Sequence, residues 1–128
     1  MRPEDDVKAE DIKWRQYIMA LGKVEVDPGQ DGLLAVEMTN EARMERFIFD
    51  DGDSDFEVVR ISVAGVDLSA SHLIGTPLSV FRMMTAGILM GGRPVTPGQK
   101  IELVVRNVSD SRSKLRAALL ITITKGTV

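Results

Sequence analysis

The alternation of apolar and polar residues is clearest in the last third of the chain. In Lys100–Val108 one parity is apolar and the other mostly charged, with Ile101, Leu103 and Val105 on the first and Lys100, Glu102 and Arg106 on the second. A period of two is typical of a strand that buries one face and exposes the other. Lys114–Lys125 also alternates, and the polar segment Ser109–Ser113 separates the two strands. We therefore predict a terminal β-hairpin.

The second strand of this predicted hairpin has an incompletely polar outer face. Its buried parity would hold Leu115, Ala117, Leu119, Ile121 and Ile123. The opposite parity places Ala118 and Leu120 beside Arg116. Since this is more apolar surface than a solvated strand face needs, we expect something to cover it.

Shorter strands are predicted upstream. From Arg15 on, one parity holds Ile18, Ala20, Val24 and Val26, and we expect these residues to be buried on both sides of a bulge at Gly22. Asp27–Gly32 contains Pro28-Gly29, a strong tight-turn signal, and predicts a hairpin to the strand Leu33–Thr39. The latter would bury Leu34, Val36 and Met38.

Two further strands, Met44–Phe49 and Phe56–Gly65, precede an ambiguous stretch. In the first, Phe47 and Phe49 face one way; in the second, Val59, Ile61 and Val63 alternate with Val58, Arg60 and Ser62. Leu78–Gly92 is apolar and Met-rich, and it fits either a helix between Pro77 and Gly87 or an extended loop followed by a short strand, Gly87–Met90.

Seven or eight short strands at regular spacing, without a long helix, predict an all-β fold. We expect an antiparallel, jelly-roll-like β-sandwich in one domain, residues 15–128, preceded by a flexible N-terminal arm, residues 1–14. The arm is charge-rich, and Ile12 and Trp14 are its natural anchors for docking on a neighbouring subunit. Alternatively, the arm is disordered, or Trp14 caps the core of its own domain.

Composition excludes several classes of protein. The 128 residues include no cysteine, so disulfides and thiolate metal sites are impossible, and a reducing cytosol suits the chain. No apolar run approaches the length of a membrane span, and no secretory signal is expected at Met1–Asp6. The net charge of −3 hides an asymmetry: residues 1–81 carry 8 Lys/Arg and 17 Asp/Glu, whereas residues 82–128 carry 8 and 2. The halves either neutralise each other within one fold or attract between copies.

Candidate catalytic and metal-binding residues are few. The acidic loop has carboxylates at every other residue, which suits Ca²⁺, at Asp51, Asp53 and Asp55. Phe56 and Ser62 break the EF-hand pattern, so we favour a solvated loop that carries no metal. His72 is the only histidine, which is too few for a two-His metal centre, and no nucleophile turn is present. We predict a protein without a cofactor or small-molecule substrate that is not an enzyme.

A row of basic residues suggests contact with acidic groups. Arg112, Lys114 and Arg116 share a parity, and Arg106 would join them across the predicted hairpin. Such a row could bind phosphate, but no aromatic residues are interleaved with it, so we do not expect nucleic acid as a partner. Salt bridges to the acidic half of another copy, or plain solvation, are favoured.

Apolar residues outside the strands are candidates for contacts between subunits. The Met-rich stretch is either core filler or an exposed contact surface. Together with the arm and the outer face of the last strand, it supplies the candidates for an interface: Ile12, Trp14, Phe81, Met83, Met84, Leu89, Met90 and Leu120.

Several short motifs resemble a known group of proteins. They are Phe56-x-Val-x-x-Ile-x-Val-x-Gly65, Pro77-Leu-Ser-Val-Phe81, Pro97-Gly-Gln-x-Ile-x-Leu-x-Val-x-Asn-x-Ser109 and Arg116-Ala-Ala-Leu-Leu120. Over residues 44–124 the chain resembles small single-domain β-sandwich proteins of bacteriophages and phage-like genomes. The resemblance implies a capsid or capsid-associated (decoration) subunit that binds itself and other virion proteins, is assembled in the host cytoplasm and has no catalytic residues. The alternative is a carbohydrate-binding or Ca²⁺-dependent ligand-binding sandwich that uses the acidic loop.

Overall fold

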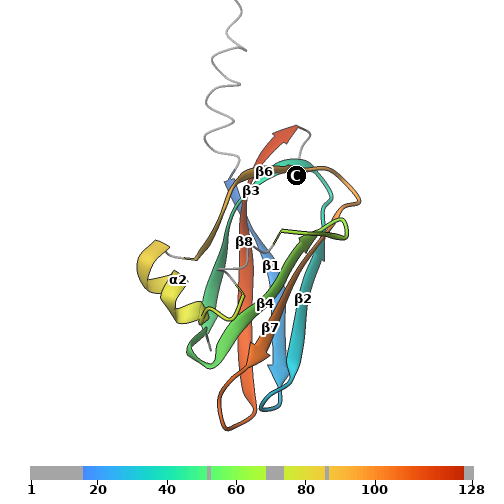
Figure 1. Ribbon diagram of the computed structural model, residues 1–128. Coiled ribbons are helices and arrows are strands. Elements are labelled where there is room, and N and C mark those ends of the chain that lie inside the picture. Colours follow the sequence, from blue (N-terminus) through green and yellow to red (C-terminus); the bar gives the residue numbers. More distant parts are fainter. Residues whose placement is uncertain (1–15, 52, 69–73, 86, 126–128) are drawn as a thin grey trace, which may run out of the picture.

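Two antiparallel four-stranded sheets pack face to face (Figure 1). The computed structural model describes residues 16–51, 53–68, 74–85 and 87–125. The strands are β1 (Gln16–Val26), β2 (Asp31–Glu37), β3 (Glu41–Asp51), β4 (Phe56–Val63), β5 (Val66–Asp67), β6 (Ile88–Val95), β7 (Lys100–Asn107) and β8 (Ser113–Lys125). A 3₁₀ turn, η1 (Asp53–Asp55), and one α-helix, α2 (Leu78–Thr85), complete the described elements.

The strand order is that of a jelly roll. One sheet has the order β1-β8-β3-β6 and the other β2-β7-β4-β5. Early strands therefore pair with late ones, β1 with β8, β2 with β7, β3 with β6 and β4 with β5, as when one long hairpin is wrapped into two sheets. The prediction of an all-β, jelly-roll-like sandwich is confirmed. The predicted arm, residues 1–14, lies outside the described residues.

Both predicted hairpins are wrong in their pairing. The turn between β1 and β2 forms as expected, because the Gln30 amide donates to the Asp27 carbonyl over 3.1 Å and Gly29 takes a positive φ of 76°. However, β1 and β2 belong to different sheets, and so do β7 and β8. Each turn carries the chain from one sheet to the other, so the terminal hairpin predicted over residues 100–125 does not exist.

The facing sides of the two sheets form the core. On β8 the predicted parity is buried from Leu115 to Ile123, and on β7 it is buried at Ile101, Leu103 and Val105. The residues expected to face inward in the predicted strand Leu33–Thr39 do so: Leu34 of β2 and Met38, directly after β2, are buried, and Val36 is half-buried. Phe47 and Phe49 of β3 join them. Alternation therefore predicted the core side of four strands.

Bulges shift the buried side of β1 and β4. The register slips at Gly22, as expected, but Leu21 is the residue buried before the slip, and Ile18 is 68% exposed. In β4 the register slips between Val58 and Arg60, so Val58 is buried together with Ile61. The predictions that Ile18 and Ala20 face the core, and that Val59 shares the side of Ile61, are therefore wrong.

The ambiguous Met-rich stretch contains both a helix and a strand. Leu78 at the start of α2 is fully buried, and Phe81 packs against the core. The strand that follows, β6, is longer than predicted and continues to Val95. In Figure 1, α2 lies beside the sandwich rather than between its sheets.

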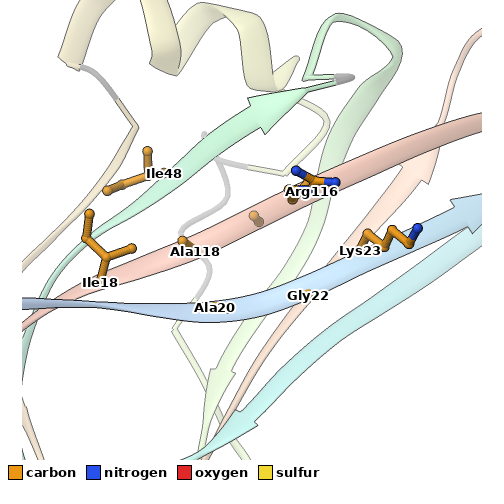
Figure 2. Close-up of a pocket in the computed structure, with 8 residues that line it drawn as sticks. Ile18, Ala20, Gly22, Lys23, Ile48, Arg116 and Ala118 are labelled. Carbon is orange, nitrogen blue, oxygen red and sulfur yellow. The ribbon is translucent and has the colours of Figure 1, made fainter.

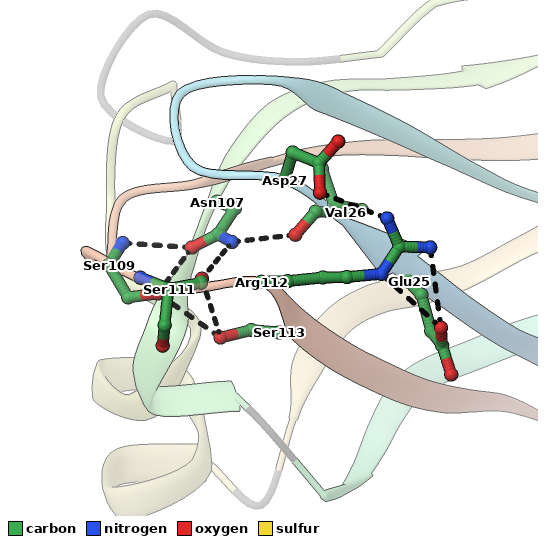
Figure 3. Close-up of polar contacts among 8 residues, drawn as sticks. All are labelled: Glu25, Val26, Asp27, Asn107, Ser109, Ser111, Arg112 and Ser113. Carbon is green, nitrogen blue, oxygen red and sulfur yellow. Dashed lines mark hydrogen bonds and ion pairs between the residues drawn. The ribbon is translucent and has the colours of Figure 1, made fainter.

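Asn107 ties together the turns at one end of the sandwich (Figure 3). Its buried amide nitrogen donates to the carbonyls of Val26 and Ser111, both over 2.8 Å. Its side-chain oxygen accepts from the amide of Ser109 over 2.8 Å and from the Ser109 hydroxyl over 2.7 Å. The backbone of Asn107 also exchanges hydrogen bonds with Gly29 and Gln30. One side chain therefore links the β1–β2 turn to the β7–β8 turn.

Candidate contact surface

The outer face of the β1-β8-β3-β6 sheet carries an apolar centre. Two cross-strand rows build it, because residues directly opposite in a sheet share a face. In one row Ile18, Leu120, Arg46 and Leu89 follow one another across all four strands, and in the next row Ala20, Ala118 and Ile48 cross three. Ile18 and Leu89 are 68% and 56% exposed. We call these seven residues the sheet face.

The sheet face is hollowed where its side chains are small (Figure 2). A cavity of about 490 Å³ lies over Ala20, Gly22 and Ala118. Ile18 and Ile48 lie at one end of it, whereas Lys23 and Arg116 lie at the other, as Figure 2 shows. One end of the cavity is therefore lined by apolar side chains and the other end by basic ones.

A second hollow, of about 310 Å³, adjoins Leu120 and Leu89. Its lining includes Arg46 and Glu45, so it is more polar than the first. The Glu45 carboxylate accepts a hydrogen bond of 2.6 Å from the Thr122 hydroxyl. The two hollows together make the sheet face uneven, which suits an irregular partner surface better than a flat one.

Charged side chains of both signs surround the apolar centre. Among the described residues of this outer side, Lys23, Arg43, Arg46, Lys114 and Arg116 stand against Glu25, Glu41 and Glu45. Lys23 and Arg116 are directly opposite each other in the β1–β8 ladder, where like charges repel. On its other side, Arg116 is in register with Asp51 of β3.

The opposite side of the sandwich differs in its charge pattern. On β7, Arg106 binds Asp31 of β2 with 2.8 Å between Nε and Oδ1. Lys100 lies opposite Glu37 in the same pair of strands. In these two pairs, opposite charges face each other across β2 and β7, and Leu33 is an exposed apolar residue of the edge strand β2.

The predicted basic row is only partly present. Arg106 belongs to the other sheet, so the prediction that it joins Arg112, Lys114 and Arg116 is wrong. The hydrogen bond and charge of Asp31 raise the pKa of Arg106. Arg112 pairs with Asp27 and Glu25 of the β1 end, at 2.9 and 3.4 Å, and Asp27 contributes most to its raised pKa. These ion pairs lie within one chain.

The other interface candidates are divided between core and surface. Phe81 and Met90 are half-buried and pack against the core, whereas Leu89 and Leu120 belong to the sheet face. Met83 and Met84 lie in α2, and their side chains are outside what the structure describes. Ile12 and Trp14 precede the described residues.

The acidic loop takes part in the fold. Asp55 accepts a hydrogen bond of 2.9 Å from the Ser113 hydroxyl, and its carbonyl accepts one from the amide of Val108. Asp51 ends β3 in register with Arg116, and Asp53 begins η1. Within the described part of the chain, no three acidic or histidine side chains gather as metal ligands. His72 lies outside that part.

We expect calorimetric titration with Ca²⁺ to show no micromolar binding, because Asp55 already has a protein partner. Micromolar binding that Asp53→Asn abolishes would contradict this prediction and favour a Ca²⁺-dependent ligand-binding module.

Sequence reasoning missed Ile18, Ile48 and Lys23 as surface residues of one patch. Ile18 was expected in the core, and only the strand order brings Ile48 next to Ala118. The available signal was Gly22, since a bulge there changes which residues of β1 face outward. Leu120 and Ala118 were expected on the outer face, and both are half-buried there.

Comparisons with known proteins leave the chain without an assigned family. No family model matches it, and neither a curated protein nor a solved structure shows significant similarity to it. Among the described residues, no helix has the length and apolar character needed to cross a membrane.

Proposed function

We propose that this chain is a structural subunit that acts through self-assembly, as a capsid or capsid-associated protein of a virion. The jelly roll supports this proposal, because viral capsid subunits use it, as do lectins and the cupins. The observation that carries it is the sheet face, an apolar centre formed by residues from all four strands on the outside of the sandwich. Exposed apolar patches rimmed by polar residues are typical of protein contacts.

The other uses of the fold have less support from this chain. A cupin-type metal centre needs several histidines, and the sequence has one. Sugar binding commonly relies on exposed aromatic rings. Among the described residues, Tyr17 is the aromatic residue with an exposed side chain, at 40% exposure. Of these three functions, contact between proteins therefore agrees best with the side chains of this chain. The proposed partners are other copies of the chain and other virion proteins, and assembly takes place in the host cytoplasm.

The test is the oligomeric state of the full chain and of Ile18→Lys. We expect light scattering over a concentration series to show an oligomer, and electron micrographs to show rings or shells. Ile18→Lys should raise the concentration for half-assembly about tenfold or more, because it places a charge in the apolar centre. Ile18 is 68% exposed, so the substitution leaves the core intact.

Leu33→Lys is the matched control. It places the same charge on an edge strand of the other sheet, where Leu33 is 48% exposed, and we expect assembly to be unchanged. A monodisperse monomer at every concentration, unaffected by deletion of residues 1–13, would contradict the proposed function.

A further inference from the structure

We infer that β1 pairs edge to edge with β1 of a second copy, antiparallel, through Gln16–Leu21. This inference rests on the proposed self-assembly and names the strand that makes the contact. β1 is an edge strand of its sheet, and among the described strands β8 is the one that pairs with it. The N–H and C=O groups on the other side of β1 form an open edge, with which a further strand can pair.

The first half of this edge lacks the features that protect edges from pairing. Gln16–Leu21 contains no charged residue, proline or glycine, and uncharged segments of about this length pair readily between chains. The second half of the strand is different, because it begins with the bulge at Gly22 and carries Lys23 and Glu25. Bulges and charged side chains discourage pairing at an edge. The first half of β1 is therefore the part available to a partner.

Apolar side chains of this half are uncovered on both sides of the sheet. On the outer side, Ile18 is 68% exposed, and Ala20 borders the cavity of about 490 Å³. On the inner side, Tyr17 is 40% exposed and Met19 is half-buried. Both border a further hollow of about 180 Å³. Since side chains of a strand alternate between faces, an added strand would cover both sides, whereas a partner on the sheet face reaches only the outer one.

The other edges of the sandwich oppose strand pairing. β6, at the far end of the same sheet, contains Pro94 and two glycines with positive φ, Gly91 and Gly92. In the other sheet, β5 has two residues, and β2 begins and ends with an exposed acidic residue, Asp31 and Glu37. Of the described edge strands, another β1 is therefore the best partner for β1.

The pairing satisfies the symmetry of a dimer. A two-fold axis perpendicular to the sheet at Met19 brings the two segments together in antiparallel register. Ile18 of one copy then lies opposite Ala20 of the other, so that a large side chain packs beside a small one. The two sheets become continuous, and because both sheet faces lie on the same side, their apolar centres merge.

Hydrogen exchange of the backbone amides tests the inference on the full chain, with exchange quenched and then measured residue by residue by NMR. In an edge strand, alternate amides point away from the neighbouring strand and exchange fast. We expect the outward amides within Tyr17–Leu21 to exchange about tenfold or more slowly at high protein concentration than at low concentration. The outward amides of the edge strand β2 are the matched control and should not change.

Two variants extend the test. Ile18→Lys should return the outward amides of β1 to fast exchange at high concentration, because the axis at Met19 brings the two new lysines close together. Leu33→Lys, on β2, should leave them slow.

The outcomes separate this inference from the proposed function. Fast outward amides of β1 in a chain that light scattering shows to be oligomeric would overturn the inference and leave self-assembly standing. A monomeric chain would overturn both. Slower exchange that β1 shares with β2 or with residues 1–15 would identify a different strand as the partner and overturn the pairing of β1 with itself. Outward amides that are slow at every concentration would place the partner in the same chain, which also overturns it.

Discussion

Replacement of Asn107 by alanine is expected to lower the free energy of unfolding by about 3 kcal/mol. The side chain makes four hydrogen bonds of 2.7–2.8 Å, two as donor and two as acceptor. Alanine removes all four and leaves the Val26 carbonyl, in a buried position, without this donor. Because the backbone bonds of Asn107 to Gly29 and Gln30 remain possible, the loss reports on the side chain alone.

Urea unfolding followed by circular dichroism, at one fixed protein concentration, measures this change. Ser111→Ala is the matched control, because it keeps the carbonyl that Asn107 binds and removes an exposed hydroxyl. We expect the control to change the free energy of unfolding by less than about 0.5 kcal/mol. A loss below about 1 kcal/mol in Asn107→Ala would show that the two turns hold together without this side chain.

The position of Asn107 explains why local patterns predicted turns but not their pairing. Pro28-Gly29 correctly predicted a chain reversal, because proline presets φ and glycine accepts a positive φ. Turn chemistry acts over four residues and says nothing about which sheet receives the next strand. In this fold, both turns at the Asn107 end move the chain to the opposite sheet, and a buried asparagine joins them.

The buried sides of strands were predictable only up to the first bulge. Alternation in β7 and β8 correctly assigned every core residue from Ile101 to Val105 and from Leu115 to Ile123. In β1 the bulge was predicted at Gly22, but its shift of parity was not, so Ile18 was assigned to the core. In β4 nothing in the sequence marks the slip after Val58.

The candidate contact surface required the strand order as well. The sequence of the last strand alone predicted that Ala118 and Leu120 lie on an outer face and that another surface covers this face. Ile18 and Ile48 flank them only because β1 and β3 lie on either side of β8. Ile18 is about 100 positions from Leu120 along the chain, and Ile48 is about 70 positions from Ala118. The alternation of residues within one strand cannot predict contacts between positions so far apart.

Gly87→Ala is expected to destabilise the fold by about 3 to 5 kcal/mol, because two costs add at this position. A Cβ on Gly87 would lie 1.9 Å from the carbonyl oxygen of Phe47, and backbone atoms cannot move aside cheaply. Gly87 also has a φ of 130°, a conformation that side chains strongly disfavour. The collision falls where β6 begins to pair with β3, since Ile88 is in register with Phe47.

Gly91→Ala separates the collision from the cost of positive φ, because Gly91 lies in β6, the strand that begins directly after Gly87. Gly91 has a φ of 67°, and no heavy atom lies within 4 Å of a Cβ built there. Alanine should therefore cost only about 1 to 2 kcal/mol, the ordinary penalty of the left-handed region. Thermal and urea unfolding of both variants measure the difference. Equal losses in the free energy of unfolding would mean that β6 moves away from β3 to accept the methyl group. In that case Leu89, at the edge of the sheet face, would be held less firmly than Ile18 and Leu120.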